Sequence, residues 1–163
     1  MGTTETSSLS HFTMSFDGAL LQRGFWVYVW RITHGAGLHL YVGRTGDSSS
    51  PHAGSPFTRI GQHLDVRSSA KGNALGKRLN AAGVTATDCK FAMIAIGPLF
   101  PEADSMELHC PLRDQVGAVE KALAELLRLR GYSVLGVHHS GVAPDRETMN
   151  AVAVIIDEHF PAL

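Results

Sequence analysis

The amino-acid sequence predicts an α+β fold in which a small central antiparallel β-sheet of about three strands is flanked by helices. Two runs rich in aromatic and β-branched residues lie on either side of a glycine-containing turn, which is typical of a β-hairpin. A third apolar run ends at Gly97-Pro98, and helix signals occupy much of the remaining sequence. A hairpin mixed with helices favours the α+β class over a parallel sheet.

The first half of the chain is expected to contain the hairpin and two helices. We predict strands over 25–33 and 38–43, joined by a turn at 34–37, where glycine tolerates positive φ. Ser55 is a good N-cap and Pro56 suits the first helical position, so a helix should carry the sequence FTRIGQHLDV. A second helix is expected over residues 73–82, ended by Gly83.

The second half should add one buried strand, a long helix and a C-terminal helix. The apolar run over 90–96 predicts the buried third strand. The clearest helix covers about 113–130 and stops at Gly131. The sequence YSVLGV predicts a short edge strand, and a last helix is expected over 146–160 with Asp145 as its N-cap.

Length and composition suggest one ordinary globular domain. The 163 residues, 44% of them hydrophobic, suit a single domain over 23–163 with a C-terminal helical extension, preceded by a flexible polar leader at 1–22. The two cysteines do not make a disulfide framework, and we expect a cytoplasmic protein. No apolar run is long enough to predict a membrane-spanning helix. The net charge of −1 argues against a generic nucleic-acid binder but permits a local basic surface.

Glu120 lies in an unexpected place on the predicted long helix. It shares a face with Val116, Leu123, Ala124 and Leu127, the apolar stripe that should face the sheet. A buried carboxylate is costly unless it is paired or binds a cation. The alternative is that Glu120 lies at the edge of the stripe and reaches water.

Arg59 and His63 are four residues apart on the first predicted helix and should project from the same face. Phosphodiester hydrolysis needs a cation that stabilises developing charge and groups that position or deprotonate water. Arginine and histidine suit these tasks. The alternative is an ordinary solvated helix face.

Taken in order, these residues resemble the GIY-YIG nuclease family. The sequence VYV contains Tyr28, YVGRT begins at Tyr41, and Arg59, His63 and a helical Glu120 follow. The resemblance covers about residues 26–127, and YVGRT with the Arg-x-x-x-His spacing is its most specific part.

The resemblance implies a small central antiparallel sheet flanked by helices, one divalent ion (Mg²⁺ or Mn²⁺) and hydrolysis of phosphodiester bonds in DNA. It implies that Tyr28 and Tyr41 are the two motif tyrosines, with Tyr28 expected to help activate the attacking water. Arg59 would stabilise charge on the scissile phosphate, and His63 would support proton transfer or orient a tyrosine. Glu120 would be the metal ligand, a suitable role for carboxylate oxygen.

The same resemblance suggests substrate-binding residues around the site. Gly43 would permit close backbone approach, and Arg44 would lie near the phosphate. Lys71 and Asn73 stand where some relatives have another histidine. Further basic side chains after the site helix are candidates for phosphate contacts, with a solvated helix face as the alternative: Arg67, Lys77 and Arg78.

The chain departs from the family pattern in two places. The segment between Tyr41 and Arg59 is long and rich in Ser, Gly and Pro, as in restriction-enzyme-like members. Many members carry an Asn after the Glu helix, which is missing in register here; Ser133 and His138 are the possible substitutes.

The leading hypothesis is therefore a metal-dependent DNA endonuclease. Because no zinc-finger or helix-turn-helix signature is visible, we expect specificity to come from a loop, the C-terminal segment, a homodimer or a separate targeting protein. The first alternative is a catalytically weakened module that binds nucleic acid or a protein partner. The second is a small-molecule enzyme of unrelated fold.

Overall fold

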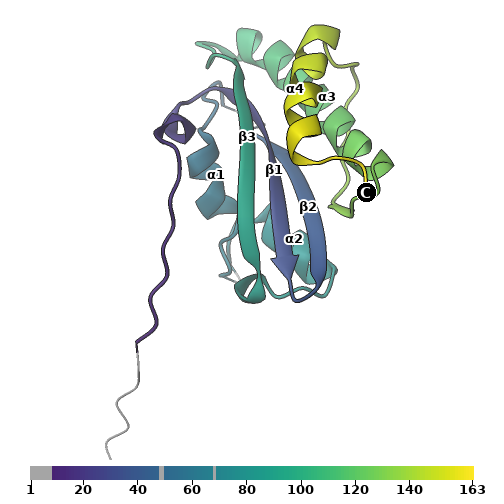
Figure 1. The fold of residues 1–163 in the computed structure, drawn as a ribbon. Coiled ribbons are helices and arrows are strands. Elements are labelled where there is room, and N and C mark those ends of the chain that lie inside the picture. The colour runs from purple at the N-terminus through teal and green to yellow at the C-terminus, as the bar shows by residue number, and fades with distance from the viewer. Residues whose placement is uncertain (1–8, 48–49, 68) are drawn as a thin grey trace, which may run out of the picture.

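The computed structural model describes residues 9–47, 50–67 and 69–163 (Figure 1). Within these ranges, four strands, four α-helices and two short 3₁₀ helices follow one another. In order they are η1 (Gly18–Leu21), β1 (Phe25–His34), β2 (Gly37–Arg44), α1 (Pro56–His63), α2 (Ala74–Ala81), η2 (Ala86–Asp88), β3 (Lys90–Phe100), α3 (Met106–Leu129), β4 (Val134–Leu135) and α4 (Arg146–His159).

The strands form one mixed sheet in the order β3-β1-β2-β4. The β1–β2 hairpin is antiparallel, with Tyr28 opposite Gly43 and Trp30 opposite Tyr41. β3 is antiparallel to β1 on the other side, whereas β4 runs parallel to β2. The α+β prediction is confirmed, but the expected sheet of about three antiparallel strands is wrong. After α3 the chain forms β4, which lies beside β2 and runs parallel to it. Local sequence does not predict this pairing, because it depends on the direction in which the chain returns to the sheet.

β3 also differs from its prediction. The sequence indicated a buried strand over 90–96, but β3 extends to Phe100 and lies at the edge of the sheet. Ile96 is the one buried residue of β3. An apolar run cannot by itself distinguish a central strand from an edge strand, because neighbours elsewhere in the sequence decide which it becomes.

Helices cover both faces of the sheet, and successive residues of β1 therefore belong to two different cores (Figure 1). Val27 and Val29 pack with side chains of α3 and α4, while Tyr28 and Trp30 pack with side chains of α2. This follows from the two-residue period of a strand. Tyr41 also lies on the α2 side, so both motif tyrosines belong to one layer.

The starts of α1, α3 and α4 follow local capping chemistry. The Ser55 hydroxyl accepts the backbone N–H of Thr58 at 3.2 Å, and the Asp145 carboxylate accepts that of Thr148 at 2.8 Å. Both predicted N-caps are confirmed. α3 begins earlier than expected, with Ser105 as N-cap and Pro111 inside the helix.

The expected leader at 1–22 is described only in part, because residues 1–8 lie outside the described residues. The Phe16 ring packs on Phe57 of α1 with ring centroids 4.6 Å apart, and η1 follows. Cys89 and Cys110 are free thiols, in agreement with the prediction. No helix in the described part of the chain is long and apolar enough to cross a membrane.

Candidate functional site

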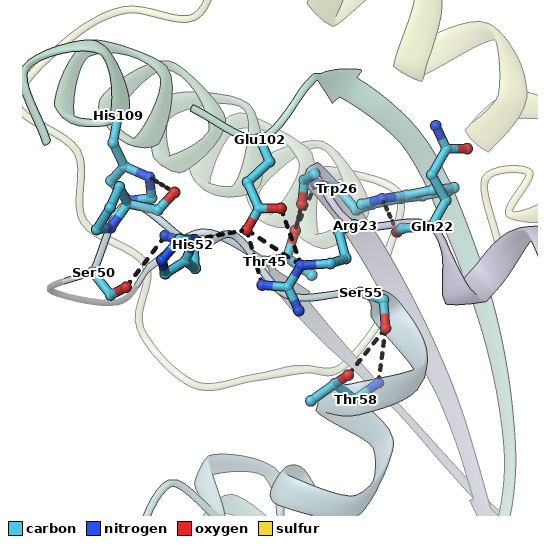
Figure 2. Close-up of polar contacts among 12 residues, drawn as sticks. Gln22, Arg23, Trp26, Thr45, Ser50, His52, Ser55, Thr58, Glu102 and His109 are labelled. Atoms are coloured by element: carbon cyan, nitrogen blue, oxygen red, sulfur yellow. Dashed lines mark hydrogen bonds and ion pairs between the residues drawn. The ribbon is translucent and has the colours of Figure 1, made fainter. Parts of the chain in front are cut away.

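The described residues of the β2–α1 connection, 45–47 and 50–55, make polar contacts with residues near the starts of β1 and α3 (Figure 2). The Thr45 hydroxyl accepts the backbone N–H of Trp26 at 2.8 Å. The Glu102 carboxylate pairs with Arg23 at 2.8 Å and with His52 at 3.4 Å. These contacts hold the segment leading into α1, the helix that carries Arg59 and His63.

Tyr28 and His63 form a buried polar pair beneath α1. The Tyr28 hydroxyl lies 2.6 Å from His63 Nε2 and donates to the backbone carbonyl of Arg44 at 3.0 Å. Because the phenol has one proton, we assign the Nε2–H of His63 as the donor to the phenol oxygen. His63 is then neutral, and burial, followed by the charge of Arg59, lowers its pKa to about 4.

The two tyrosines differ in their access to solvent. Tyr28 is fully buried, and burial raises its pKa far above the ordinary value despite the opposing effect of Arg59. Tyr41 is 8% exposed, and its pKa is raised to about 12 by burial and then by the charge of Glu120. The ring of Tyr41 also lies against His63, with centroids 5.4 Å apart. The expectation that Tyr28 activates water is therefore disfavoured, because a buried phenol holds its proton and does not reach the solvent.

Arg59 lies beside this pair and is held from the loop side. Its Nη2 is 2.7 Å from Asp47 Oδ2, and its Nη1 donates to Gln62 Oε1 at 2.9 Å. The Arg59 charge lowers the pKa of both tyrosines and of Glu120, so its electrostatic influence reaches all three groups. Asp47 is a contributor that the sequence did not single out, since an Asp in a long polar loop has no local signal.

Glu120 is neither fully buried nor free in water. Its Oε2 lies 3.0 Å from Arg44 Nε, and its side chain is 16% exposed. Burial raises its pKa to about 7, although the Arg44 charge acts in the opposite direction. The Arg44 Nη1 also donates to the backbone carbonyl of Arg113 at 2.5 Å. The predicted position of Glu120 on the apolar stripe is thus accommodated by an ion pair with the end of β2.

Some of these residues meet at a polar cavity of about 230 Å³. Tyr41, Arg44 and Glu120 line it directly. Its other lining residues are Ala74, Arg78, Gly136, Val137, His138 and His139. Tyr28, His63 and Arg59 are not part of this lining. The Tyr28–His63 pair lies behind it, because the His63 ring contacts that of the lining residue Tyr41.

Glu120 is the one carboxylate in the lining of this cavity. Residues 9–47, 50–67 and 69–163 hold no group of three His, Cys, Asp or Glu side chains that could bind a metal ion. This donor set does not suit a closed zinc site, which needs several protein ligands. It fits a hydrated Mg²⁺ or Mn²⁺ ion, because hard cations use carboxylate oxygen and Mg²⁺ usually keeps several waters.

The predicted substrate-binding residues are divided among different places. Arg44 lies in the cavity, whereas Lys71 is exposed and outside its lining. The Asn73 side chain donates to the Asp65 carbonyl at 3.1 Å and faces a separate cavity of about 360 Å³. Gly43 makes room for a protein side chain: a Cβ there would lie 2.5 Å from Tyr28 Cε2.

The structure separates the two candidates for the missing Asn. His138 lines the cavity and lies 3.0 Å, through Nε2, from the Val42 carbonyl. Ser133 instead contacts His39, with Oγ 2.9 Å from Nδ1. His138 therefore occupies the position nearer Glu120. Gly117 of α3 lies against the Arg44 guanidinium and was not singled out from the sequence. A glycine inside a long helix was an available signal.

Comparisons of the chain with protein-family models, with curated proteins and with solved structures found no match.

Proposed function

We propose that this chain is a divalent-metal-dependent endonuclease of GIY-YIG type that hydrolyses phosphodiester bonds in DNA. The observation that carries the proposal is the meeting of Tyr41, Arg44 and Glu120 at one polar cavity, with the Tyr28–His63 pair behind it. Tyr41 and Arg44 belong to β2 and Glu120 belongs to α3, two segments that are far apart in the sequence. Their types supply a metal-binding carboxylate, a cation for phosphate and a hydroxyl for water.

In this proposal the cations and the carboxylate divide the work on the phosphate. Glu120 holds Mg²⁺ or Mn²⁺, which when bound neutralises charge on the phosphate and the leaving oxygen. Arg59 stabilises charge that develops on the scissile phosphate. Arg78, which lines the same cavity, offers a further contact to the DNA backbone.

We assign the water-orienting role to Tyr41 rather than Tyr28. Tyr41 lines the cavity, whereas Tyr28 is fully buried. Since its pKa is raised to about 12, Tyr41 acts as a neutral hydroxyl that hydrogen-bonds the water. Tyr28 and His63 then act as positioning residues, because His63 contacts both rings and fixes their relation.

The second candidate function is a module that binds DNA or a protein partner with weakened cleavage. Two ion pairs favour it: Arg44 is held by Glu120, and Arg59 is held by Asp47. In such a module these arginines would exchange their carboxylates for ligand phosphates without hydrolysis. A homodimer or a separate targeting protein would supply specificity under either function.

The decisive experiment compares Glu120→Gln with Glu125→Gln on supercoiled plasmid, in Mn²⁺, in Mg²⁺ and with EDTA. Glu125 is an exposed carboxylate on the same helix and serves as the matched control. We expect wild type and Glu125→Gln to cleave with either metal, and Glu120→Gln or EDTA to abolish cleavage. Equal cleavage by Glu120→Gln would reject the proposed metal role. Binding of DNA without cleavage by wild type would support the second candidate function.

A further inference from the structure

Arg44 lies between two open spaces, and among the described residues only Nε and Nη1 of its guanidinium group have close partners. Nε faces Glu120 at 3.0 Å, and Nη1 donates to the Arg113 carbonyl at 2.5 Å. Its side chain lines both the cavity of about 230 Å³ beside Glu120 and an adjoining one of about 270 Å³ beside Asp114. The side chain is 21% exposed, so a ligand in either cavity can reach it.

α3 contains a specific space for this guanidinium. A Cβ on Gly117 would lie 2.8 Å from Arg44 Nη1 and 3.1 Å from its Cζ. Glycine inside a helix costs about 1 kcal/mol relative to alanine. The helix therefore carries a destabilising residue at a position where any side chain would force the Arg44 guanidinium to shift.

The Glu120 carboxylate cannot satisfy Arg44 and a divalent cation equally well. Two positive charges at one carboxylate repel each other, and the repulsion is strong in a half-buried site. A guanidinium that leaves Glu120 has an alternative partner when a phosphate lies in the cavity, because Arg binds phosphate through paired hydrogen bonds. Arg44 thus has one anionic partner in the free protein, Glu120, and a second anionic partner that arrives with the substrate.

We infer that Arg44 is a positioning residue that moves from Glu120 to a substrate phosphate, so that metal binding and nucleic-acid binding strengthen each other. The inference rests on the proposed function, since it takes Glu120 as the metal ligand. By linkage, a phosphate that removes Arg44 raises the metal affinity, and the metal raises the phosphate affinity by the same factor. Free protein would hold the metal weakly, and protein bound to DNA would hold it tightly.

The first measurement is binding of Mn²⁺ alone, followed by the electron paramagnetic resonance signal of the free ion. Wild type is compared with Arg44→Met, Gly117→Ala and Glu120→Gln at about pH 8.5, where carboxylates are largely ionised. Arg44→Met removes the competing charge, and Gly117→Ala displaces the guanidinium while leaving that charge in the protein. Alanine favours the helix, so Gly117→Ala keeps the test valid if Arg44→Met folds poorly. We expect both variants to bind Mn²⁺ roughly fivefold or more tightly than wild type.

The second measurement is the affinity for a short fluorescein-labelled DNA duplex with and without Mn²⁺. Glu120→Gln serves as the reference, because it reports the effect of Mn²⁺ on DNA itself. Relative to that reference, Mn²⁺ should tighten DNA binding by wild type about fivefold or more. It should tighten DNA binding by Arg44→Met by a smaller factor, because only the direct effect of the ion on the phosphate then remains.

The outcomes separate this inference from the function on which it rests. If Mn²⁺ binds wild type but not Glu120→Gln, and Arg44→Met and Gly117→Ala bind it no more tightly than wild type, the inference is overturned and the metal site stands. Weaker Mn²⁺ binding by Arg44→Met would also overturn it, since Arg44 would then only keep Glu120 ionised. If no form binds Mn²⁺, both the metal site and the inference are rejected.

Discussion

Glu120 shows how one carboxylate acquires a perturbed pKa. It is mostly removed from water, and the resulting penalty on its charged form exceeds the compensation from Arg44, so its pKa rises to about 7. His63 is perturbed in the opposite direction, to about 4, because burial penalises its protonated form. Burial therefore shifts both groups towards their neutral forms, which are the protonated form of Glu120 and the deprotonated form of His63.

The first prediction concerns stability against pH. The folded pKa of Glu120 is raised from 4.5 to about 7, so between these pH values the folded state binds more protons than the unfolded state. The contribution of Glu120 to the free energy of unfolding therefore falls as the pH rises from 4.5 through 7. Glu120→Gln should therefore be more stable than wild type above pH 7, by up to about 3 kcal/mol, with the difference shrinking towards pH 4.5. Urea unfolding across pH measures it.

His63 makes stability change with pH in the opposite direction, because its folded pKa is lowered from 6.5 to about 4. Its contribution to the free energy of unfolding grows as the pH rises between these values. Only the difference between variant and wild type isolates Glu120. Glu125→Gln, at an exposed position of α3, should give a flat difference. A difference for Glu120→Gln that does not vary with pH would contradict the raised pKa.

The second prediction separates the tyrosines. Tyr41→Phe should lower DNA cleavage by about a hundredfold while leaving stability nearly unchanged, because Tyr41 lines the cavity. Tyr28→Phe should cost about 1–3 kcal/mol in stability, because it removes the hydroxyl that contacts His63 and the Arg44 carbonyl. Cleavage and unfolding are measured on both variants. A larger loss of cleavage for folded Tyr28→Phe than for Tyr41→Phe would reverse the assignment.

At the scale of elements, the β1–β2 hairpin is adapted to the buried phenol. Gly43 faces Tyr28 across the ladder, and the ring occupies the space that a side chain at 43 would need. The sequence analysis expected Gly43 to allow a close backbone approach. The close approach exists, but the approaching group is a ring of the protein itself.

The third prediction follows from this contact. Gly43→Ala places a methyl group 2.5 Å from Tyr28 Cε2, and the fully buried ring has little room to move. We expect a loss of about 1–3 kcal/mol. Gly61→Ala is the matched control in α1, because nothing lies within 4 Å of its added Cβ, and it should gain about 0.5–1 kcal/mol. Denaturant unfolding of the two variants should shift in opposite directions; equal shifts would exclude the steric explanation.

At the scale of the whole molecule, the sheet separates two cores with different tasks. The core under α3 and α4 is almost entirely apolar. It packs residues of β1 with three side chains from the C-terminal segment: Val152, Ile156 and Phe160. The core under α1 and α2 contains the tyrosine pair and borders His63. The apolar core stabilises the fold, while the polar-containing core places the candidate site. The C-terminal helix, expected as an extension, shares the main core.

The fourth prediction tests that role of α4. Phe160 is fully buried and lies beneath Arg31, whose Cζ is 5.0 Å from the ring centroid. Phe160→Ala should cost about 3–5 kcal/mol. Val154→Ala, at a position that is 61% exposed, should change stability by less than about 0.5 kcal/mol. A small loss of stability for Phe160→Ala in thermal or denaturant unfolding would mean that α4 contributes little to the stability of the fold.

Local chemistry explains which parts of this picture were predictable. Ser55 and Asp145 act as the expected N-caps because a cap depends on residues within one helical turn. The hairpin followed from strand propensity and a glycine turn. Arg59 and His63 do lie on one helix, but His63 turns into the protein while Arg59 remains partly exposed. Helical spacing gives a shared face and leaves open how each side chain is buried.

The sequence by itself determined the α+β class, the hairpin and the starts of α1 and α4, and it supplied the residues that we propose for phosphodiester chemistry. These features depend on neighbours along the chain. Only the tertiary structure decided that β4 joins β2 in parallel, that Tyr28 is buried while Tyr41 meets the cavity, and that Arg44 pairs with Glu120. Each of these depends on burial or on contacts between segments far apart in sequence, and the energies of both are fixed only when the whole chain has packed.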